Sequence, residues 1–259
     1  MKRYKGKIND LVYVYLNESK QYVLSFGIEF PEFVHALHHV MNNLLILAPS
    51  FDESEFNLHT QLEYIPAKRI YRLIKSEKYK YGEFSWIDFE EVQALNELSG
   101  QELAEILYLG HMKTHLRSPF YNRLGNRFVY LSRDDGWWNK VYYRNMRDFY
   151  RMVGDVIALK AGEKKTDKGI LGMKRKQPLL PGINIDVLLN LKQLMKEGLL
   201  FSIRDMKKTR NTLEIPLWII GHFEYMDDMI DEYRKVVKSR FDVKLVFDKR
   251  LKEWKMFVN

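Results

Sequence analysis

The chain contains no cysteine among its 259 residues. This absence excludes a disulfide framework, a thiolate metal site and a cysteine nucleophile. It fits the reducing cytoplasm, and we expect a cytoplasmic protein. Long apolar runs are also absent, because the longest, NNLLILAPSF and IPLWIIG, fall far short of the roughly 20 residues that cross a membrane. No signal sequence follows the basic N-terminus, so we expect a soluble protein without a membrane partner.

Common catalytic motifs are missing as well. The sequence has neither a Gly-x-Gly-x-x-Gly loop nor a P-loop, and it has no Gly-x-Ser-x-Gly nucleophile turn. These absences exclude the sequence signatures of dinucleotide, P-loop nucleotide and α/β-hydrolase sites. The sequence leaves open whether the protein is an enzyme, and it identifies no cofactor.

Aromatic residues are abundant, which indicates a folded chain with a substantial core. Hydrophobic residues make up 46% of the sequence, with 15 Phe, 16 Tyr and 5 Trp. Chains that stay disordered have far fewer such residues. The length fits one large domain or two modest ones.

Strand-forming runs around turn residues predict β-hairpins over residues 11–28, 126–145, 199–221 and 242–258. Apolar residues spaced three and four apart predict helices, whereas the acidic stretch 50–64 is predicted to be a loop. Because hairpins pair antiparallel, we expect an α+β fold in which several antiparallel hairpins pack with amphipathic helices. The predicted helices cover residues 30–47, 66–79, 88–98, 99–116, 145–160, 184–198 and 223–240. Ser99, followed three residues later by Glu102, predicts a capping box at the start of the 99–116 helix.

A stretch rich in glycine, proline and basic residues separates the two halves of this pattern. Residues 161–181 show little periodicity and are the predicted linker. We expect an N-terminal α+β domain at 1–160 and a C-terminal αββαββ domain at 182–259. The alternative is one domain over 1–259 with a long basic loop.

Charge is distributed unevenly along the chain, whose formal net charge is +8. From Glu29 to Glu105 there are 14 acidic and 6 basic residues, a net charge of −8. From His111 to Lys176 there are 16 basic and 6 acidic residues, a net charge of +10. A basic segment of this strength is typical of a surface that meets phosphate.

Aromatic and basic residues are interleaved in this basic segment. Arginine binds phosphate and stacks on rings, and aromatic side chains stack on bases, so the pattern favours a nucleic-acid surface. Basic residues of the predicted linker would add phosphate contacts. The candidate binding residues are Arg117, Arg123, Arg127, Arg133, Trp137, Trp138, Lys140, Arg144, Arg147, Lys174, Arg175 and Lys176.

A second interpretation places these same residues inside the protein's own packing. Neighbouring strand residues point to opposite faces, so at least one of Trp137 and Trp138 and one of Tyr142 and Tyr143 should lie in the core. The arginines are equally able to pair with the acidic stretch 52–105, within the chain or between copies.

Two histidine pairs are candidate metal ligands. His35 and His39 are four residues apart, as are His111 and His115. Residues at this spacing share one face of a helix, so each pair is able to chelate one metal ion. Neither pair carries the glutamate of the His-Glu-x-x-His motif, which argues against zinc-protease chemistry.

A weak nuclease pattern lies near the C-terminus. Asp242 and Lys244 are two apart in a predicted strand and therefore point to one side, and Glu214 is a candidate second carboxylate. Such a set is able to hold Mg²⁺ and to stabilise charge on phosphate. The alternative is a solvated sheet edge.

Three function classes follow from these patterns. The first is a non-enzymatic binding or regulatory protein whose basic-aromatic region engages nucleic acid or an acidic protein partner. The second is a metal-dependent hydrolase or nuclease. The third is an interaction module whose acidic and basic faces pair with each other. The sequence does not give the oligomeric state.

Overall fold

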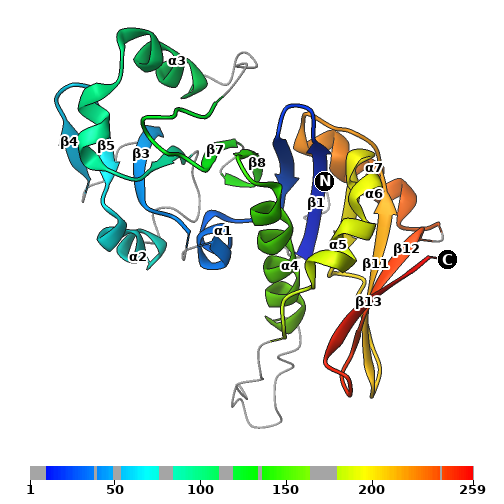
Figure 1. Ribbon diagram of the computed structural model, residues 1–259. Helices are drawn as coiled ribbons and strands as arrows, with labels where there is room; N and C mark the ends of the chain where they lie inside the picture. The colour runs from blue at the N-terminus through cyan, green and yellow to red at the C-terminus, as the bar shows by residue number, and fades with distance from the viewer. Residues whose placement is uncertain are drawn as a thin grey trace. The chain divides into compact units, whose positions relative to one another are not determined.

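The structure is a computed structural model of the chain (Figure 1). It describes residues 10–37, 40–48, 54–75, 84–110, 119–133, 136–163, 180–239 and 241–258. Helices and antiparallel strands both occur along the whole of this part, which confirms the predicted α+β class.

The chain forms two compact units. One, here the terminal unit, contains Met1–Leu16, Ser25–Ile28 and Arg147–Asn259. The other, here the central unit, contains Asn17–Leu24 and Glu29–Met146. This grouping assigns the segments on both sides of the predicted linker to the terminal unit. The linker lies largely in residues 164–179, outside the described residues, so the division at 161–181 stays a prediction.

An antiparallel sheet forms the centre of the central unit, in the strand order β8-β7-β6-β3-β5-β4. The tip of the hairpin formed by β1 (Leu11–Asn17) and β2 (Tyr22–Phe26) lies beside β8, where the Tyr143 amide donates to the Gln21 carbonyl at 3.0 Å. The strands are β3 (Asn43–Ala48), β4 (Glu55–Asn57), β5 (Leu62–Ile65), β6 (Ser85–Phe89), β7 (Phe128–Arg133) and β8 (Trp138–Tyr143).

Aromatic rings from one helix and from neighbouring strands make the core of this unit. Phe33 is buried, and its ring centroid lies 5.8 Å from that of Trp86, 6.0 Å from Phe128 and 5.0 Å from Tyr130. Trp86 and Tyr130 stack on neighbouring strands with an angle of 6° between their ring planes. The helices are α1 (Phe30–Leu37), α2 (Ala67–Lys75), the 3-10 helix η3 (Val92–Glu97) and α3 (Gly100–Gly110).

The predicted helix over residues 30–47 is wrong in its second half. Helix α1 ends at Leu37, and β3 begins at Asn43. Leu44 and Leu45 are both fully buried although they point to opposite faces of the strand. A short apolar run buried on both faces has no period of its own, so the sequence pattern does not separate it from a buried helix.

The acidic stretch predicted to be a loop contains a short hairpin instead. Strands β4 and β5 pair antiparallel from Glu55–Tyr64 to Asn57–Leu62. The turn is closed by Asn57, whose side-chain oxygen accepts from the Thr60 amide at 2.8 Å. These strands are short, and the half-buried Glu55 and Glu63 interrupt the apolar alternation by which a strand is predicted from sequence.

In the terminal unit, strands follow the order β13-β12-β11-β9-β1, with β10 beside β11. The hairpin predicted over 11–28 is present, and its second strand is divided between the units after Leu24. The strands are β1 (Leu11–Asn17), β2 (Tyr22–Phe26), β9 (Leu199–Ser202), β10 (Lys207–Lys208), β11 (Thr212–Ile219), β12 (Val243–Asp248) and β13 (Glu253–Val258).

Helices cover both faces of this sheet. On one face Trp254 Nε1 donates to the Pro181 carbonyl at 2.8 Å, just before α5. On the other, the ring of Trp218 meets that of Tyr233 in α7 at 6.3 Å. The predicted helix over 184–198 is interrupted at Leu191. The helices are α4 (Met146–Glu163), α5 (Ile185–Asn190), α6 (Lys192–Lys196) and α7 (Met226–Val236).

Candidate polyanion-binding surface

The rings of the predicted basic-aromatic surface lie mostly in the core. Trp138 has 3% of its surface exposed, Tyr142 has 2% and Tyr143 has none. Trp137 is half-buried in the turn before β8. Three of these four rings are therefore buried and unable to stack on a base.

Two cations of this region, Lys140 and Arg144, lie against rings of the protein itself. Lys140 Nζ is 4.5 Å from the ring centroid of Tyr22 and 5.1 Å from that of Tyr142. The guanidinium of Arg144 lies 5.5 Å from the centre of the Phe120 ring. Cation–π contacts of this length stabilise the fold and orient the charge.

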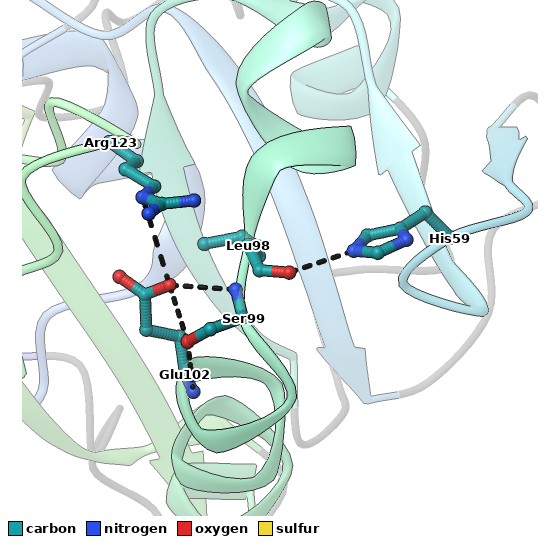
Figure 2. A network of polar contacts seen from close by, with 5 residues as sticks. All are labelled: His59, Leu98, Ser99, Glu102 and Arg123. Atoms are coloured by element: carbon teal, nitrogen blue, oxygen red, sulfur yellow. Dashed lines mark hydrogen bonds and ion pairs between the residues drawn. The ribbon is translucent and has the colours of Figure 1, made fainter.

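Arg123 points to the acidic stretch of the chain (Figure 2). Its Nε lies 4.0 Å from the Glu102 carboxylate, a long ion pair at an exposed position. Glu102 also accepts hydrogen bonds from the amide and hydroxyl of Ser99, each at 2.8 Å. These bonds, led by the one from the Ser99 amide, hold the pKa of Glu102 below its usual range. Arg123 thus takes part in the internal pairing that the second interpretation predicted.

Helix α3 begins with the capping box that the sequence predicted. The Glu102 amide donates to the Ser99 hydroxyl at 3.2 Å, while the Glu102 carboxylate accepts from the Ser99 amide. We expect Ser99→Ala to lower the free energy of unfolding by about 1 kcal/mol, because the Glu102 amide loses its acceptor. Denaturant titration measures the change, and Ser99→Thr, which retains the hydroxyl, serves as the control. Equal losses in both variants would contradict the capping role.

Arg127 lies beside a buried carboxylate of the acidic stretch. Asp88 Oδ1 accepts from the backbone amides of Arg127 at 2.9 Å and of Phe128 at 2.6 Å. Burial raises the pKa of Asp88 to about 7, against the opposing effect of these two amides and the Arg127 charge. Asp88 therefore fixes the entry into β7, and the Arg127 charge helps to compensate for its burial.

The raised pKa of Asp88 makes the stability of the fold depend on pH. The folded protein binds a proton at Asp88 that the unfolded chain releases above its ordinary pKa of 3.8. The free energy of unfolding should therefore fall as pH rises from about 4 to about 7 and then level off. Asp88→Asn keeps an oxygen for both amides and should remove this contribution. Denaturant titrations at several pH values test it, and identical pH profiles for both proteins would refute it.

The remaining candidate binding residues of the basic-aromatic region lie in different parts of the chain. Arg133 and Arg147 are exposed, but Arg133 belongs to the central unit and Arg147 to the terminal unit. Four others lie outside the described residues, namely Arg117, Lys174, Arg175 and Lys176. In the described part of this region, most aromatic rings are therefore buried in the core, and the exposed arginines are divided between the two units.

The metal candidates are mostly outside the described residues. His35 is exposed on α1, whereas His39, His111 and His115 lie beyond the described part of the chain. Within the described part, no three histidine, aspartate or glutamate residues form a group that could hold a metal ion.

The nuclease candidates are engaged in local contacts. Lys244 Nζ binds Glu214 at 3.1 Å across β11 and β12. The Asp242 carboxylate accepts from the Ile219 amide at 3.0 Å and so closes the sheet edge. A hollow beside Lys244 and Glu214 has a volume of about 10 Å³, room for one water molecule.

A stronger cationic surface lies where the turns of two hairpins meet. The β10–β11 turn and the β12–β13 turn together form what we call the twin-turn tip, residues 207–211 and 248–255. The Lys249 amide donates to the Asn211 carbonyl at 2.9 Å, and its ammonium binds the Thr209 and Arg210 carbonyls. Figure 1 shows both hairpins projecting past α5, α6 and α7.

The twin-turn tip carries a net charge of +5, from seven basic and two acidic residues. Only Lys249 is partly buried, and the other basic side chains are exposed. Within the described residues, Lys207, Lys208, Arg210 and Lys252 form no ion pair. The seven basic residues are Lys207, Lys208, Arg210, Lys249, Arg250, Lys252 and Lys255.

Nearby carboxylates are held by other groups. Asp248 Oδ1 accepts from the amides of Arg250 at 2.8 Å and Leu251 at 3.1 Å, and these bonds keep its pKa low. Glu214 lies opposite Lys207 in the ladder, yet its carboxylate binds Lys244. Glu253 is 3.9 Å from Lys255, with both side chains largely exposed. The tip therefore keeps most of its positive charge available.

Comparison of the chain with protein-family models, with curated proteins and with solved structures found no match. In the part of the chain that the structure describes, no helix has the length and apolar character needed to cross a membrane.

The sequence predicts the 199–221 hairpin, but nothing in its turn singles that turn out as a site. Its signals are MKKTRN and DKRLK, two short runs separated by about forty residues in the sequence. Neither is unusual alone. Antiparallel pairing of Thr212 with Asp248 brings the two basic runs together. The cationic cluster therefore depends on the register of the sheet and is not visible in either run alone.

Proposed function

We propose that the protein is a non-enzymatic binding protein that engages nucleic acid through the phosphates of its backbone. The twin-turn tip is the contact surface. The observation that supports this proposal is the cluster of exposed cations on two rigidly joined turns, four of them without an ion pair among the described residues.

Phosphate backbone suits this surface because of its charge density. Double-stranded DNA carries one negative charge per roughly 1.7 Å of its axis, so several cations of one tip are able to meet phosphates together. Lysine and arginine on short turns keep their charged ends in water until contact is made. Each contact then releases condensed counterions, which favours binding.

The buried rings indicate what kind of contact to expect. Base stacking needs exposed aromatic side chains, and the rings of residues 138–143 are in the core. Contact through phosphate therefore fits better than contact through bases. The exposed arginines 133, 144 and 147 remain additional candidates for phosphate binding.

A salt series tests the proposed function. Fluorescence anisotropy of a labelled 20-base-pair duplex should give a slope of log affinity against log salt of about −4 to −5, as expected for five phosphate contacts. An unrelated protein of equal net charge is the control. Equal affinity for both proteins would contradict the proposal. Preferential binding to polyglutamate would instead indicate an acidic protein partner and would also contradict it.

A further inference from the structure

One apolar side chain lies in the most cationic part of the twin-turn tip. Leu251 has 58% of its surface exposed, and it lies between Arg250 and Lys252. Nearby apolar side chains are buried instead, including Phe247 and Trp254 on the adjoining strands. An exposed leucine flanked by two cations at the end of a hairpin adds little to the packing of the fold. Its side chain is therefore available to contact a partner.

The turn that presents Leu251 is held in one conformation. Asp248 Oδ1 accepts from the Leu251 amide at 3.1 Å and from the Arg250 amide at 2.8 Å. Lys252 has a φ of 57°, the left-handed conformation that returns the chain to β13. Lys249 joins this turn to the neighbouring one through three carbonyls. Little ordering remains to be done when the tip meets a partner.

The composition of the tip favours a duplex over a single strand. Non-specific binding of single strands relies on exposed aromatic side chains that stack on bases, and the one aromatic residue of the twin-turn tip, Trp254, has only 5% of its surface exposed. Proteins that bend duplexes insert an apolar side chain, often leucine, between base pairs while cations hold the phosphates. Leu251, Arg250 and Lys252 supply this combination on three consecutive residues.

We propose that the twin-turn tip binds duplex nucleic acid with Leu251 inserted between adjacent base pairs. Arg250 and Lys252 contact the flanking phosphates, and the cations of the β10–β11 turn contact phosphates further along the groove. Insertion unstacks one step and bends the duplex. This inference rests on the proposed function, because it specifies the partner of the same surface.

Bending and affinity are measured separately. A duplex labelled at both ends should show increased energy transfer when the full-length protein binds, with a bend on the order of 20–90°. Leu251→Ser keeps every cation, so its salt slope should match that of the wild type while the bend is lost and affinity falls by about 10-fold or less. The matched control is Leu58→Ser, which changes an 85% exposed leucine in another turn and should leave both readouts unchanged.

The outcomes separate this inference from the proposed function. Salt-dependent binding without bending, or equal affinity for single strands and duplexes, would overturn the insertion of Leu251 and leave the proposed function standing. No binding to any nucleic acid would overturn both. Leu251-dependent binding to vesicles containing an anionic lipid, without binding to duplexes, would show that the leucine enters a membrane surface and would also overturn the inference.

Discussion

Reversal of three charges on the twin-turn tip should lower affinity for nucleic acid by on the order of 100-fold at low salt. The variant combines Lys208→Glu, Arg210→Glu and Lys252→Glu. Each substitution removes a phosphate contact with its counterion release and adds a repelling charge. The salt slope should become smaller by about 3, one unit for each lost contact. Fluorescence anisotropy over a salt series gives both quantities.

A matched variant distinguishes the tip from net charge. Lys20→Glu, Lys68→Glu and Lys238→Glu change the net charge by the same amount, and all three lysines are exposed at positions outside the tip. This control should lose only the modest, long-range part of the attraction, about 10-fold or less at low salt. If both triple variants lose the same affinity, binding follows overall charge and the tip has no special role.

Truncation of Phe33 should destabilise the central unit by about 3–5 kcal/mol. The Phe33 ring contacts four others, in Trp86, Phe128, Tyr130 and Tyr143, and only 1% of its surface is exposed. Phe33→Ala removes these contacts and leaves a cavity between α1 and the sheet. Denaturant unfolding followed by tryptophan fluorescence, which Trp86 reports, measures the loss.

The control for Phe33 is a phenylalanine of the same unit that packs little. Phe56 on β4 has 58% of its surface exposed, so Phe56→Ala should change the free energy of unfolding by about 0.5 kcal/mol or less. Similar losses for the two variants would contradict the position of the aromatic core. If Phe33→Ala lowered the free energy of unfolding only slightly and Phe56→Ala left it unchanged, the result would contradict the packing of α1 on β6 and β7.

The fold class was predictable because turns and alternation are local signals. The β7–β8 hairpin and the capping box at Ser99 depend on residues only a few positions apart, and both were predicted. Leu44 and Leu45 were assigned to a helix because burial on both faces removes the alternation that identifies a strand. That burial depends on elements from other parts of the sequence, because β3 pairs with β5 and β6 at its edges and also contacts helices α2 and α3.

The candidate site was harder to predict than the fold. Composition selected the basic-aromatic region, and strand geometry correctly predicted that part of its rings would be core. The pairing of Arg123 with Glu102 and the position of Arg127 beside Asp88 both require tertiary structure. The twin-turn tip requires it even more, because its two basic runs become neighbours only through the pairing of β11 with β12.

Protection of lysines from acetylation shows which surface of the protein a bound duplex covers. The protein is acetylated at limiting reagent with and without a saturating duplex, and mass spectrometry gives the labelling of each lysine. We expect the duplex to protect Lys207, Lys208 and Lys252 from acetylation, with the labelling of Lys20 and Lys68 unchanged. Protection confined to Lys174 and Lys176, or equal labelling of all lysines in both samples, would contradict the assignment of the twin-turn tip as the nucleic-acid surface.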